Sequence, residues 1–416
     1  MRRISVMLLG LALAAPVLAQ EGADDIGARL LKDPGVQGAI EAAVRGEALV
    51  IEDQVRLCEI PAPPFGERAR AEAYREAFEA LGLRNVRIDE VGNVIAERPG
   101  QSERPNLVFS AHLDTVFPEE TDVRVRREGT LLRGPGIGDD CRGLAVVLGV
   151  ARALQETRLQ TPGTITFVGT VGEEGLGDLR GVKHLFGTSL KGRIDRFVSV
   201  DGTGLGITHV AVGSHRYRVT FKGPGGHSYG AFGLVNPIHA LGRAIGAIAD
   251  FEVPSTPKTT FNVGRIGGGT SVNSIAFEAW MEVDMRSSDA AALASVDASF
   301  QQAVDRALAG ENERWSRGAL TVDKTLVGDR PAGRTPDTAA IVRATVSVTR
   351  ALGLAVSLDE GSTDSNIPMS LGIPAVTIDG GGRGAGAHSL GETFDGTGSV
   401  DGTRRAVLLA IALAQR

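Results

Sequence analysis

Short apolar runs alternate with longer helical stretches along most of the chain. Strands separated by helices predict an α/β fold in which a mainly parallel sheet is flanked by helices. The breaker Pro61-Ala62-Pro63-Pro64 divides the first two helical stretches. The runs with the length and composition of buried strands are 107–109, 165–168, 197–200 and 375–378, and the helical stretches are 36–57, 67–82, 143–155 and 338–352.

The section from about 212 to 325 has a different pattern. Strand-like alternation at 217–221, 259–263 and 279–284 accompanies two helical stretches, 237–248 and 290–308. This pattern predicts a smaller α+β domain of residues 212–325, inserted into a larger domain of residues 20–211 and 326–416. A length of 416 residues agrees with two domains, because single hydrophobic cores stop growing near ~250–300 residues.

The first residues have the pattern of an export signal. Arg2 and Arg3 precede an apolar run from 6 to 18, and Val17-Leu18-Ala19 is suited to cleavage after a small residue. We therefore expect residues 1–19 to be a signal peptide and the protein to be periplasmic or secreted in a bacterium. No later segment reaches ~18 consecutive apolar residues, so no membrane span is expected after signal removal.

Composition narrows the class of protein. Apolar residues make up 42% of the chain and charged residues 23%, the balance of a folded globular protein rather than a disordered one. The formal charge is −6 and no run of basic residues occurs, so a nucleic-acid partner is not expected. Cys58 and Cys141 are too few for a disulfide scaffold, and they form either one disulfide or two buried thiols.

Acidic and imidazole side chains stand at the ends of the predicted strands. Because the carboxyl ends of parallel strands meet at one edge of a sheet, we expect these side chains to converge on one crevice. Buried carboxylates repel one another unless cations lie between them, and mixed imidazole and carboxylate ligands suit zinc, with cobalt or manganese as alternatives. The residues concerned are His112, Asp114, Asp139, Asp140, Glu173, Glu174, Asp201 and His388.

Four sequence motifs carry these residues: SAHLDTV at 110–116, GPGIGDDCRG at 134–143, VGEEGLG at 171–177 and GAGAHSLGE at 384–392. Together they resemble the zinc metallohydrolases of the aminoacylase, carboxypeptidase G and peptidase T type, a family that includes succinyl-diaminopimelate desuccinylase. The resemblance covers roughly residues 50–416. It implies a zinc-exopeptidase-like catalytic domain with an inserted α+β lid that also serves for dimerisation.

The resemblance implies two Zn²⁺ ions, with Co²⁺ or Mn²⁺ as alternatives, bound by five side chains of the motifs. One side chain bridges the two ions, and each ion has two further ligands. The ligands are Asp139 as the bridge, His112 and Asp201 on one ion, and Glu174 and His388 on the other.

The same resemblance implies roles for two further residues. Glu173 would be the general base, and Asp114 would orient the ring of His112. The chain departs from the family at two places, because Gly138 stands where alanine is common and Cys141-Arg142 displaces a usual lysine. Neither departure removes a ligand.

The inserted domain carries a second set of residues that resemble those of the family. His227 follows a glycine-rich turn and would stabilise the reacting oxygen in the active site of a neighbouring subunit, which implies a homodimer. Asn273 and Arg286 would hold the free carboxylate of the substrate, since the planar fork of arginine pairs with a carboxylate through two hydrogen bonds.

These expectations combine into one hypothesis of function and two alternatives. The hypothesis is a di-zinc metallohydrolase that cleaves an amide bond beside a free carboxylate, most simply an exopeptidase acting on small peptides, either a di- or tripeptidase or a carboxypeptidase. The stretch CEIPAPPFGE at 58–67 favours the peptidase branches of the family. The alternatives are a deacylase of N-acyl amino acids and a non-catalytic periplasmic binding protein on the same scaffold.

Overall fold

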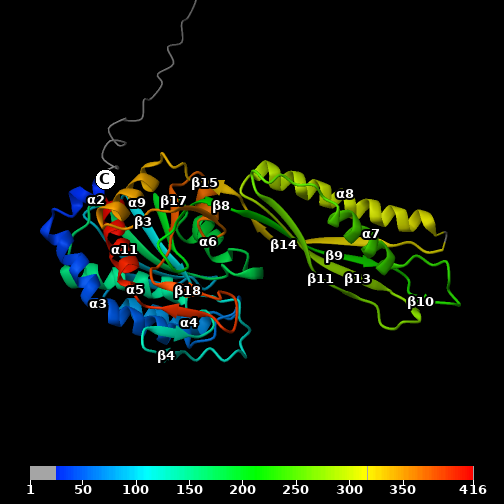
Figure 1. The fold of residues 1–416 in the computed structure, drawn as a ribbon, viewed down its shortest axis with the longest axis horizontal. Helices are drawn as coiled ribbons and strands as arrows, with labels where there is room; N and C mark the ends of the chain where they lie inside the picture. Colours follow the sequence, from blue (N-terminus) through cyan, green and yellow to red (C-terminus); the bar gives the residue numbers. More distant parts are fainter. Residues whose placement is uncertain (1–24, 316, 416) are drawn as a thin grey trace, which may run out of the picture.

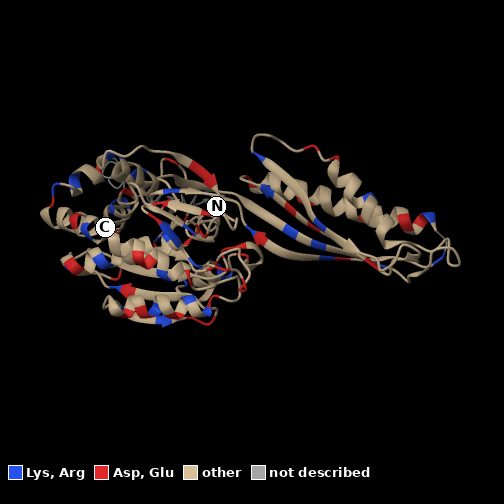
Figure 2. Cartoon of the chain, turned by 60° about the horizontal axis from the view of Figure 1, so that its bottom comes forward, with Lys and Arg blue, Asp and Glu red and all other residues tan. Residues whose placement is uncertain are grey.

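The computed structural model describes residues 25–315 and 317–415, which form two lobes joined end to end (Figure 1). The large lobe consists of residues 25–212 and 331–415, and the small lobe of residues 213–330. Positively and negatively charged residues alternate along the chain in both lobes (Figure 2). The predicted signal peptide, residues 1–19, lies outside the described residues. Within the described residues no helix is long and apolar enough to span a membrane.

The centre of the large lobe is a nine-stranded sheet whose four middle strands are those that the sequence predicts. Strands β6, β3, β7 and β17 lie side by side in this order and run parallel. Strands β1 and β2 on one side and β8 and β15 on the other pair antiparallel, while β16 runs parallel to β8. The predicted α/β fold is confirmed. The strands are β1 (Arg84–Ile88), β2 (Val94–Arg98), β3 (Asn106–His112), β6 (Thr164–Thr170), β7 (Arg196–Val200), β8 (Ile207–Ala211), β15 (Gly333–Arg334), β16 (Leu358–Gly361) and β17 (Ala375–Ile378).

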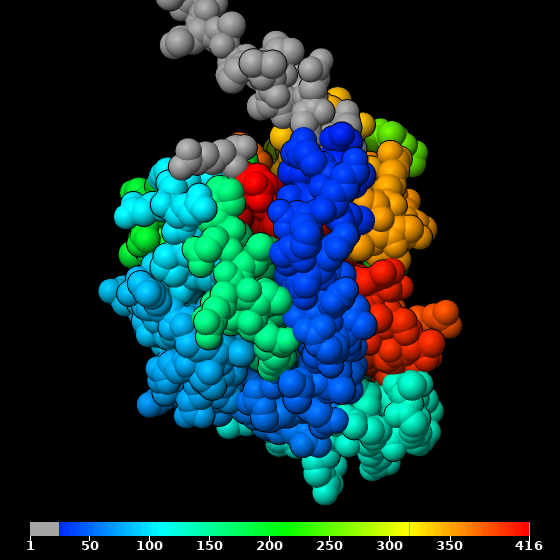
Figure 3. Space-filling view, turned by 90° about the vertical axis from the view of Figure 1, so that its left-hand side faces the viewer, coloured from blue at the N-terminus to red at the C-terminus, as the bar shows by residue number. Residues whose placement is uncertain are grey.

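Helices cover both faces of this sheet, because its middle strands are apolar on both sides. In β3, Leu107 and Phe109 face a core shared with α3, α5, α9 and α11, while Val108 faces a second core shared with α6 and α10. Helix α3 forms part of the outer surface at the end of the large lobe (Figure 3). The helices are α2 (Ile26–Leu30), α3 (Pro34–Cys58), α4 (Arg68–Ala80), α5 (Cys141–Thr157), α6 (Arg180–His184), α9 (Ala340–Ala351), α10 (Asn366–Ser370) and α11 (Val400–Leu413), with short helical turns η1 (Gly175–Gly177) and η2 (Leu185–Ser189).

A second, antiparallel sheet in the large lobe joins two segments that are far apart in sequence. Its strand order is β18-β19-β5-β4, so the segment after His388 lies against the segment before Asp139. The short runs in these strands gave no periodic signal in the sequence. The strands are β4 (Arg126–Glu128), β5 (Leu131–Arg133), β18 (Arg383–Ala385) and β19 (Thr393–Asp395).

The small lobe is a four-stranded antiparallel sheet, in the order β11-β13-β9-β14, covered on one face by two helices. Its separate apolar core includes Phe221 of β9, Met281 of β13 and Phe300 of α8. The opposite face carries charged pairs such as Arg216 with Asp284. The elements are β9 (Gly213–Lys222), β10 (Gly226–His227), α7 (Pro237–Ala249), β11 (Thr259–Gly268), β12 (Ser274–Ile275), β13 (Glu278–Ser287), α8 (Ala290–Arg314) and β14 (Thr321–Arg330).

The small lobe ends later in the chain than the sequence predicts. The expected boundary at 325 falls inside β14, which pairs with β9 as far as Arg330, opposite Ser214. The strand accommodates Gly328 at an irregularity in its pairing.

Both cysteines are fully buried free thiols. Cys58 ends α3 and Cys141 begins α5, and both belong to one small apolar cluster with Leu132 and Phe394. The thiol of Cys58 donates to the carbonyl oxygen of Pro135 at 3.4 Å. Of the two arrangements that the sequence left open, the structure contains two buried thiols.

The separate core of the small lobe leads to a prediction about stability. Phe300 is fully buried and packs against Tyr217, with ring centroids 5.0 Å apart. Phe300→Ala should destabilise the small lobe by about 3–5 kcal/mol, because it leaves a cavity in addition to removing apolar burial. Denaturant unfolding followed by fluorescence would measure this, with the exposed Phe277→Ala as a control expected to change stability little. Equal effects of the two substitutions would contradict the assignment of this core.

Candidate metal centre and active site

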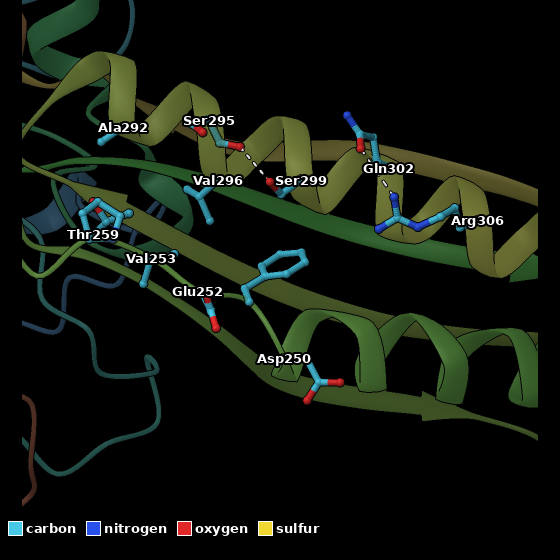
Figure 4. Close-up of a pocket in the computed structure, with 12 residues that line it drawn as sticks. Asp250, Glu252, Val253, Thr259, Ala292, Ser295, Val296, Ser299, Gln302 and Arg306 are labelled. Atoms are coloured by element: carbon cyan, nitrogen blue, oxygen red, sulfur yellow. Dashed lines mark hydrogen bonds between the residues drawn. The ribbon is translucent and has the colours of Figure 1, made fainter.

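A cavity of about 360 Å³ in the small lobe lies between α8 and residues 250–254 (Figure 4). Its described lining residues include Asp250, Glu252 and Arg306 but no histidine and none of the predicted site residues. The predicted metal ligands lie instead at one edge of the large sheet.

Side chains from three strand ends, one helix start and the segment between β18 and β19 meet at that edge. Two groups have ligand atoms that all lie within 4.8 Å of one another: His112, Asp139 and Glu174 form one, and His112, Asp140 and Asp201 form the other. His112 is the last residue of β3, Asp201 follows β7 directly, and Glu174 lies on the loop after β6. The parallel order β6-β3-β7 thus brings these groups together, as the sequence predicts.

Asp139 occupies the middle of the cluster. Its Oδ1 lies 3.0 Å from Nε2 of His112, and its Oδ2 lies 3.1 Å from Nε2 of His388. Nε2 of His388 is also 2.9 Å from Oε1 of Glu174, and Nε2 of His112 is 3.9 Å from Oδ1 of Asp201. Each oxygen of Asp139 therefore faces a different imidazole, the arrangement that a bridging carboxylate requires.

Asp140 is turned away from this bridge by contacts with the backbone. Its Oδ2 accepts the backbone N–H of His112 at 3.1 Å, and its Oδ1 accepts that of Gly143 at 3.0 Å and caps α5. A Cβ on Gly143 would lie 2.3 Å from the carbonyl oxygen of Val200, so the glycine permits this close approach. The Asp139–Asp140 peptide bond is cis.

The backbone carbonyl oxygen of Asp114, and not its carboxylate, makes the closer contact with the ring of His112. Nδ1 of His112 lies 2.9 Å from the backbone carbonyl oxygen of Asp114 but 3.7 Å from its Oδ1. The carboxylate is occupied instead by the backbone N–H groups of Glu173 and Glu174, at 3.0 and 2.8 Å. Because the carbonyl oxygen can only accept, Nδ1 carries the proton and Nε2 is left as the ligating nitrogen.

Glu392 is a functional residue that the sequence motifs contained without an assigned role. Its buried carboxylate accepts backbone N–H groups of Gly136, Gly138 and Asp139 at 2.8, 2.8 and 3.1 Å. These bonds hold the loop that presents Asp139. Glu392 is the final residue of the GAGAHSLGE motif, so the sequence contained a pointer to it. Only the folded chain shows which backbone groups it contacts.

The sequence motifs did not point to Arg330 and Arg216, two arginines that contact the loop carrying Glu173. Arg330 is buried, and its Nη1 donates to Oε1 of Glu173 at 2.9 Å. Arg216 of β9 donates to the carbonyl oxygen of Gly175 at 2.6 Å. Both arginines lie on small-lobe strands, so sequence distance hides their proximity to the loop that carries Glu173.

The structure separates the three predicted residues of the small lobe. His227 and Asn273 lie together, since Ser228 N–H donates to the Asn273 carbonyl at 2.9 Å, and Figure 1 places β10 at the far end of the lobe. Arg286 lies at the other end of β13, opposite Ser214. Asn273 and Arg286 of one chain therefore lie far apart, because an extended strand advances about 3.3 Å per residue, and their contact with a substrate carboxylate stays a prediction.

The electrostatics of the cluster fit a divalent cation. Burial raises the pKa of Asp201 to about 8, and the negative charges of Asp139 and Glu174 add to this. Hydrogen bonds to Asp139 and then Glu174 raise the pKa of His388 to about 10. Without an ion these groups retain protons that a divalent metal would replace, and the donors are all imidazole nitrogens or carboxylate oxygens. The residues present therefore suit a divalent metal ion.

The sequence model of Peptidase family M20/M25/M40 matches residues 108–414, a segment that contains the metal-ligand candidates and Glu173. The chain belongs to this peptidase family. The resemblance seen in the motifs is confirmed, and this M20-family protein is a metal-dependent hydrolase of peptidase or deacylase type that acts on amide bonds.

Three known proteins illustrate this similarity. The uncharacterised protein YqjE of Bacillus subtilis is 27% identical over 259 residues, which are 58% of this chain and 67% of that protein. The N-acetylcysteine deacetylase of Bacillus subtilis is 27% identical over 208 residues, 46% of this chain and 53% of the deacetylase. A tripeptidase structure from Staphylococcus aureus has a TM-score of 0.71 and 25% identity, covering 88% of this chain and 97% of that chain. The chain thus matches only about half of the deacetylase's length.

The raised pKa values predict how stability depends on pH when divalent metal is removed. The pKa of Asp201 rises from 3.8 to about 8 and that of His388 from 6.5 to about 10, so both groups favour the folded state only while protonated. The metal-free protein should therefore lose stability between about pH 6 and pH 8.5, whereas metal needs deprotonated ligands and should stabilise more at the higher pH. Tm with zinc and with a chelator would show a metal-dependent difference that grows over this range. A chelated protein whose Tm is constant or rises would contradict the assignment.

Proposed function

We propose that this enzyme is an exopeptidase that uses two zinc ions, with Co²⁺ or Mn²⁺ as alternatives, and cleaves di-, tri- or other short peptides beside a free carboxylate. The observation that carries the proposal is the position of Asp139 between the imidazoles of His112 and His388, with Glu174 and Asp201 beside them. One ion would be held by His112, Asp139 and Asp201, and the other by Asp139, Glu174 and His388.

Glu173 supplies the proton chemistry in this proposal. When bound, divalent ions polarise the scissile carbonyl and increase the acidity of a water molecule. Glu173 takes a proton from the attacking water on its carboxylate and passes it to the leaving nitrogen. Burial raises the pKa of Glu173 well above its ordinary range, against the opposing charge of Arg330. A carboxylate with a raised pKa is the better proton acceptor near neutral pH.

A group of arginines supports recognition of a free carboxylate. Arg216 and Arg286 share the carboxylate of Asp284, through contacts of 2.9 and 2.7 Å. The side chain of Arg286 remains 42% exposed, so its guanidinium has donors directed to solvent. Positive charge beside the metal cluster favours small substrates with a carboxylate near the scissile bond.

Deacylation of N-acyl amino acids is the second candidate function. The similarity to an N-acetylcysteine deacetylase favours it, while the full-length match to a tripeptidase favours peptide cleavage. Both reactions break an amide bond beside a carboxylate. Incubation of the zinc-loaded protein with dipeptides, tripeptides and N-acetyl amino acids shows which of the two reactions it catalyses. Binding of these substrates without turnover would favour the non-catalytic alternative.

A homodimer is part of the proposal. His227 accepts the backbone N–H groups of Tyr229 and Gly230 at Nδ1, so its Nε2 carries a proton and is a donor. Tyr229, Phe232 and Val272 around it are 89, 71 and 104% exposed. An exposed apolar end with an oriented donor suits contact with a second copy, in which His227 would reach the partner's metal centre and stabilise the reacting oxygen. The arginine-then-apolar amino-terminal pattern supports export of this dimer to the periplasm or medium.

The general-base role of Glu173 gives a direct test. Glu173→Gln should lower kcat by about 10²–10⁴-fold, because the carboxylate no longer accepts the proton, while bound zinc is retained. The turnover of dipeptides and N-acetyl amino acids measures kcat, and metal analysis after dialysis measures the bound zinc. Glu103→Gln, at an exposed position of the same lobe, is the control and should behave like the parent. Full activity in Glu173→Gln would refute the assignment.

Mixing two inactive variants tests the dimer. Glu173→Gln and His227→Ala should each be inactive alone, but a heterodimer contains one site with both groups intact if His227 acts on the partner. An equal mixture after subunit exchange should regain roughly a quarter of parental activity. A mixture that stays inactive, or a protein that light scattering shows to be monomeric and active, would contradict action across a dimer.

A further inference from the structure

The loop that carries Glu173 is held by both lobes. From the large lobe, the Asp114 carboxylate accepts the Glu173 backbone N–H at 3.0 Å. From the small lobe, Arg330 donates through Nη1 to Glu173 Oε1 at 2.9 Å and through Nη2 to the Glu173 carbonyl oxygen. Arg216 donates to the carbonyl oxygen of Gly175 at 2.6 Å. The general base therefore sits on a segment shared between the lobes.

Further hydrogen bonds attach the end of the same loop to the small lobe. The backbone N–H of Asp329 donates to Asp178 Oδ1 at 2.7 Å. Lys183 of α6 donates to the Asp329 carbonyl at 2.8 Å and to Asp178 Oδ2 at 2.6 Å. Residues 173–178 are thus connected to β14 at both ends, through Arg330 and Asp329.

These contacts lie where the chain passes between the two lobes. Strand β9 begins at Gly213 and β14 ends at Arg330, and Arg330 lies opposite Ser214 in the register of the two strands. A rotation of one lobe against the other would turn about these two crossings and displace Arg216 and Arg330 relative to the large lobe. Any such rotation would act on the loop that holds Glu173.

The guanidinium of Arg330 contacts this loop and is shielded from solvent. The side chain is 4% exposed, and Nη1 donates to Ser362 Oγ at 3.1 Å as well as to Glu173. Among the described residues, the Glu173 carboxylate accepts one hydrogen bond, and it comes from Arg330. Hydrogen bonds between charged groups are about twice as strong as neutral ones, so this contact defines the direction of the carboxylate.

We propose that Arg330 is a positioning residue that sets the orientation of the Glu173 carboxylate and makes it depend on the position of the small lobe. The proposal deepens the proposed function and rests on it in one respect, the role of Glu173 as general base. Arg330 acts through Glu173 and not by contacting the substrate, so its loss changes the rate of the chemical step rather than substrate binding.

Kinetics of the full-length enzyme test this claim. Arg330→Met should lower kcat by about 10²-fold, since a misplacement of about 1 Å has an effect of that size, and should leave KM unchanged. Arg330→Lys keeps the positive charge without the planar fork and should recover part of kcat. In a Glu173→Ala background, Arg330→Met should cause little further loss of kcat, because the carboxylate that Arg330 orients is no longer present. Arg334→Met removes an exposed arginine of β15 in the large lobe, four residues after Arg330, and is the matched control that should behave like the parent.

Amide hydrogen exchange provides a readout that needs no turnover. Exchange in residues 171–180 should become faster in Arg330→Met and in Arg216→Met, and should stay unchanged in Arg334→Met. If the parent cleaves none of the amide substrates, the proposed function fails, while the exchange result still shows whether Arg330 holds the loop.

Three results would overturn the proposal. The first is a rise in KM at unchanged kcat, and the second is a full additional loss in the Glu173→Ala background, since both indicate direct contact with substrate. The third is unchanged exchange in residues 171–180 in folded Arg330→Met and Arg330→Lys. Metal analysis and thermal unfolding of each variant establish that the comparison is between folded, equally loaded proteins.

Discussion

Buried negative charge at the carboxyl ends of the parallel strands is the constraint on which the large lobe depends. Asp139, Glu174 and Asp201 converge with the rings of His112 and His388, and four of these five side chains are largely buried. Low water content strengthens the repulsion between the carboxylates, so protons or divalent cations must lie among them. The raised pKa values of Asp201 and His388 express the same constraint, because each group keeps a proton when no ion takes its place.

Three other buried carboxylates hold this site in shape without belonging to the five predicted ligands. Asp114, Asp140 and Glu392 each accept backbone N–H groups from the segments that present the ligands. Burial raises the pKa of Asp140 and of Glu392, and the hydrogen bonds from the backbone N–H groups oppose this rise. The backbone is thereby held before an ion binds, which limits the reorganisation that metal binding requires.

The division into two lobes distributes the chemistry between them. The large lobe holds the metal-ligand candidates and Glu173, while the small lobe presents Arg286 near the crossing between lobes and His227 at the far end. The length of the extended strand β13 keeps these two ends apart, so Arg286 and His227 of one copy lie at different places. Arg216 and Arg330 connect the near end to the catalytic loop, which relates the base to the orientation of the lobe.

The sequence by itself determined the four parallel strands, because period and length identify buried strands, and it placed His112 and Asp201 at the ends of two of them. Local order also determined that Asp139 and Asp140 open α5. Only the tertiary structure decided which atoms meet. Glu392 lies 256 residues from Gly136, and Arg330 lies 157 residues from Glu173, so no local pattern links them. The use of the Asp114 carbonyl in place of its carboxylate, and the separation of Asn273 from Arg286, also depend on how distant segments pack, since hydrogen-bond partners are chosen by space and not by chain order.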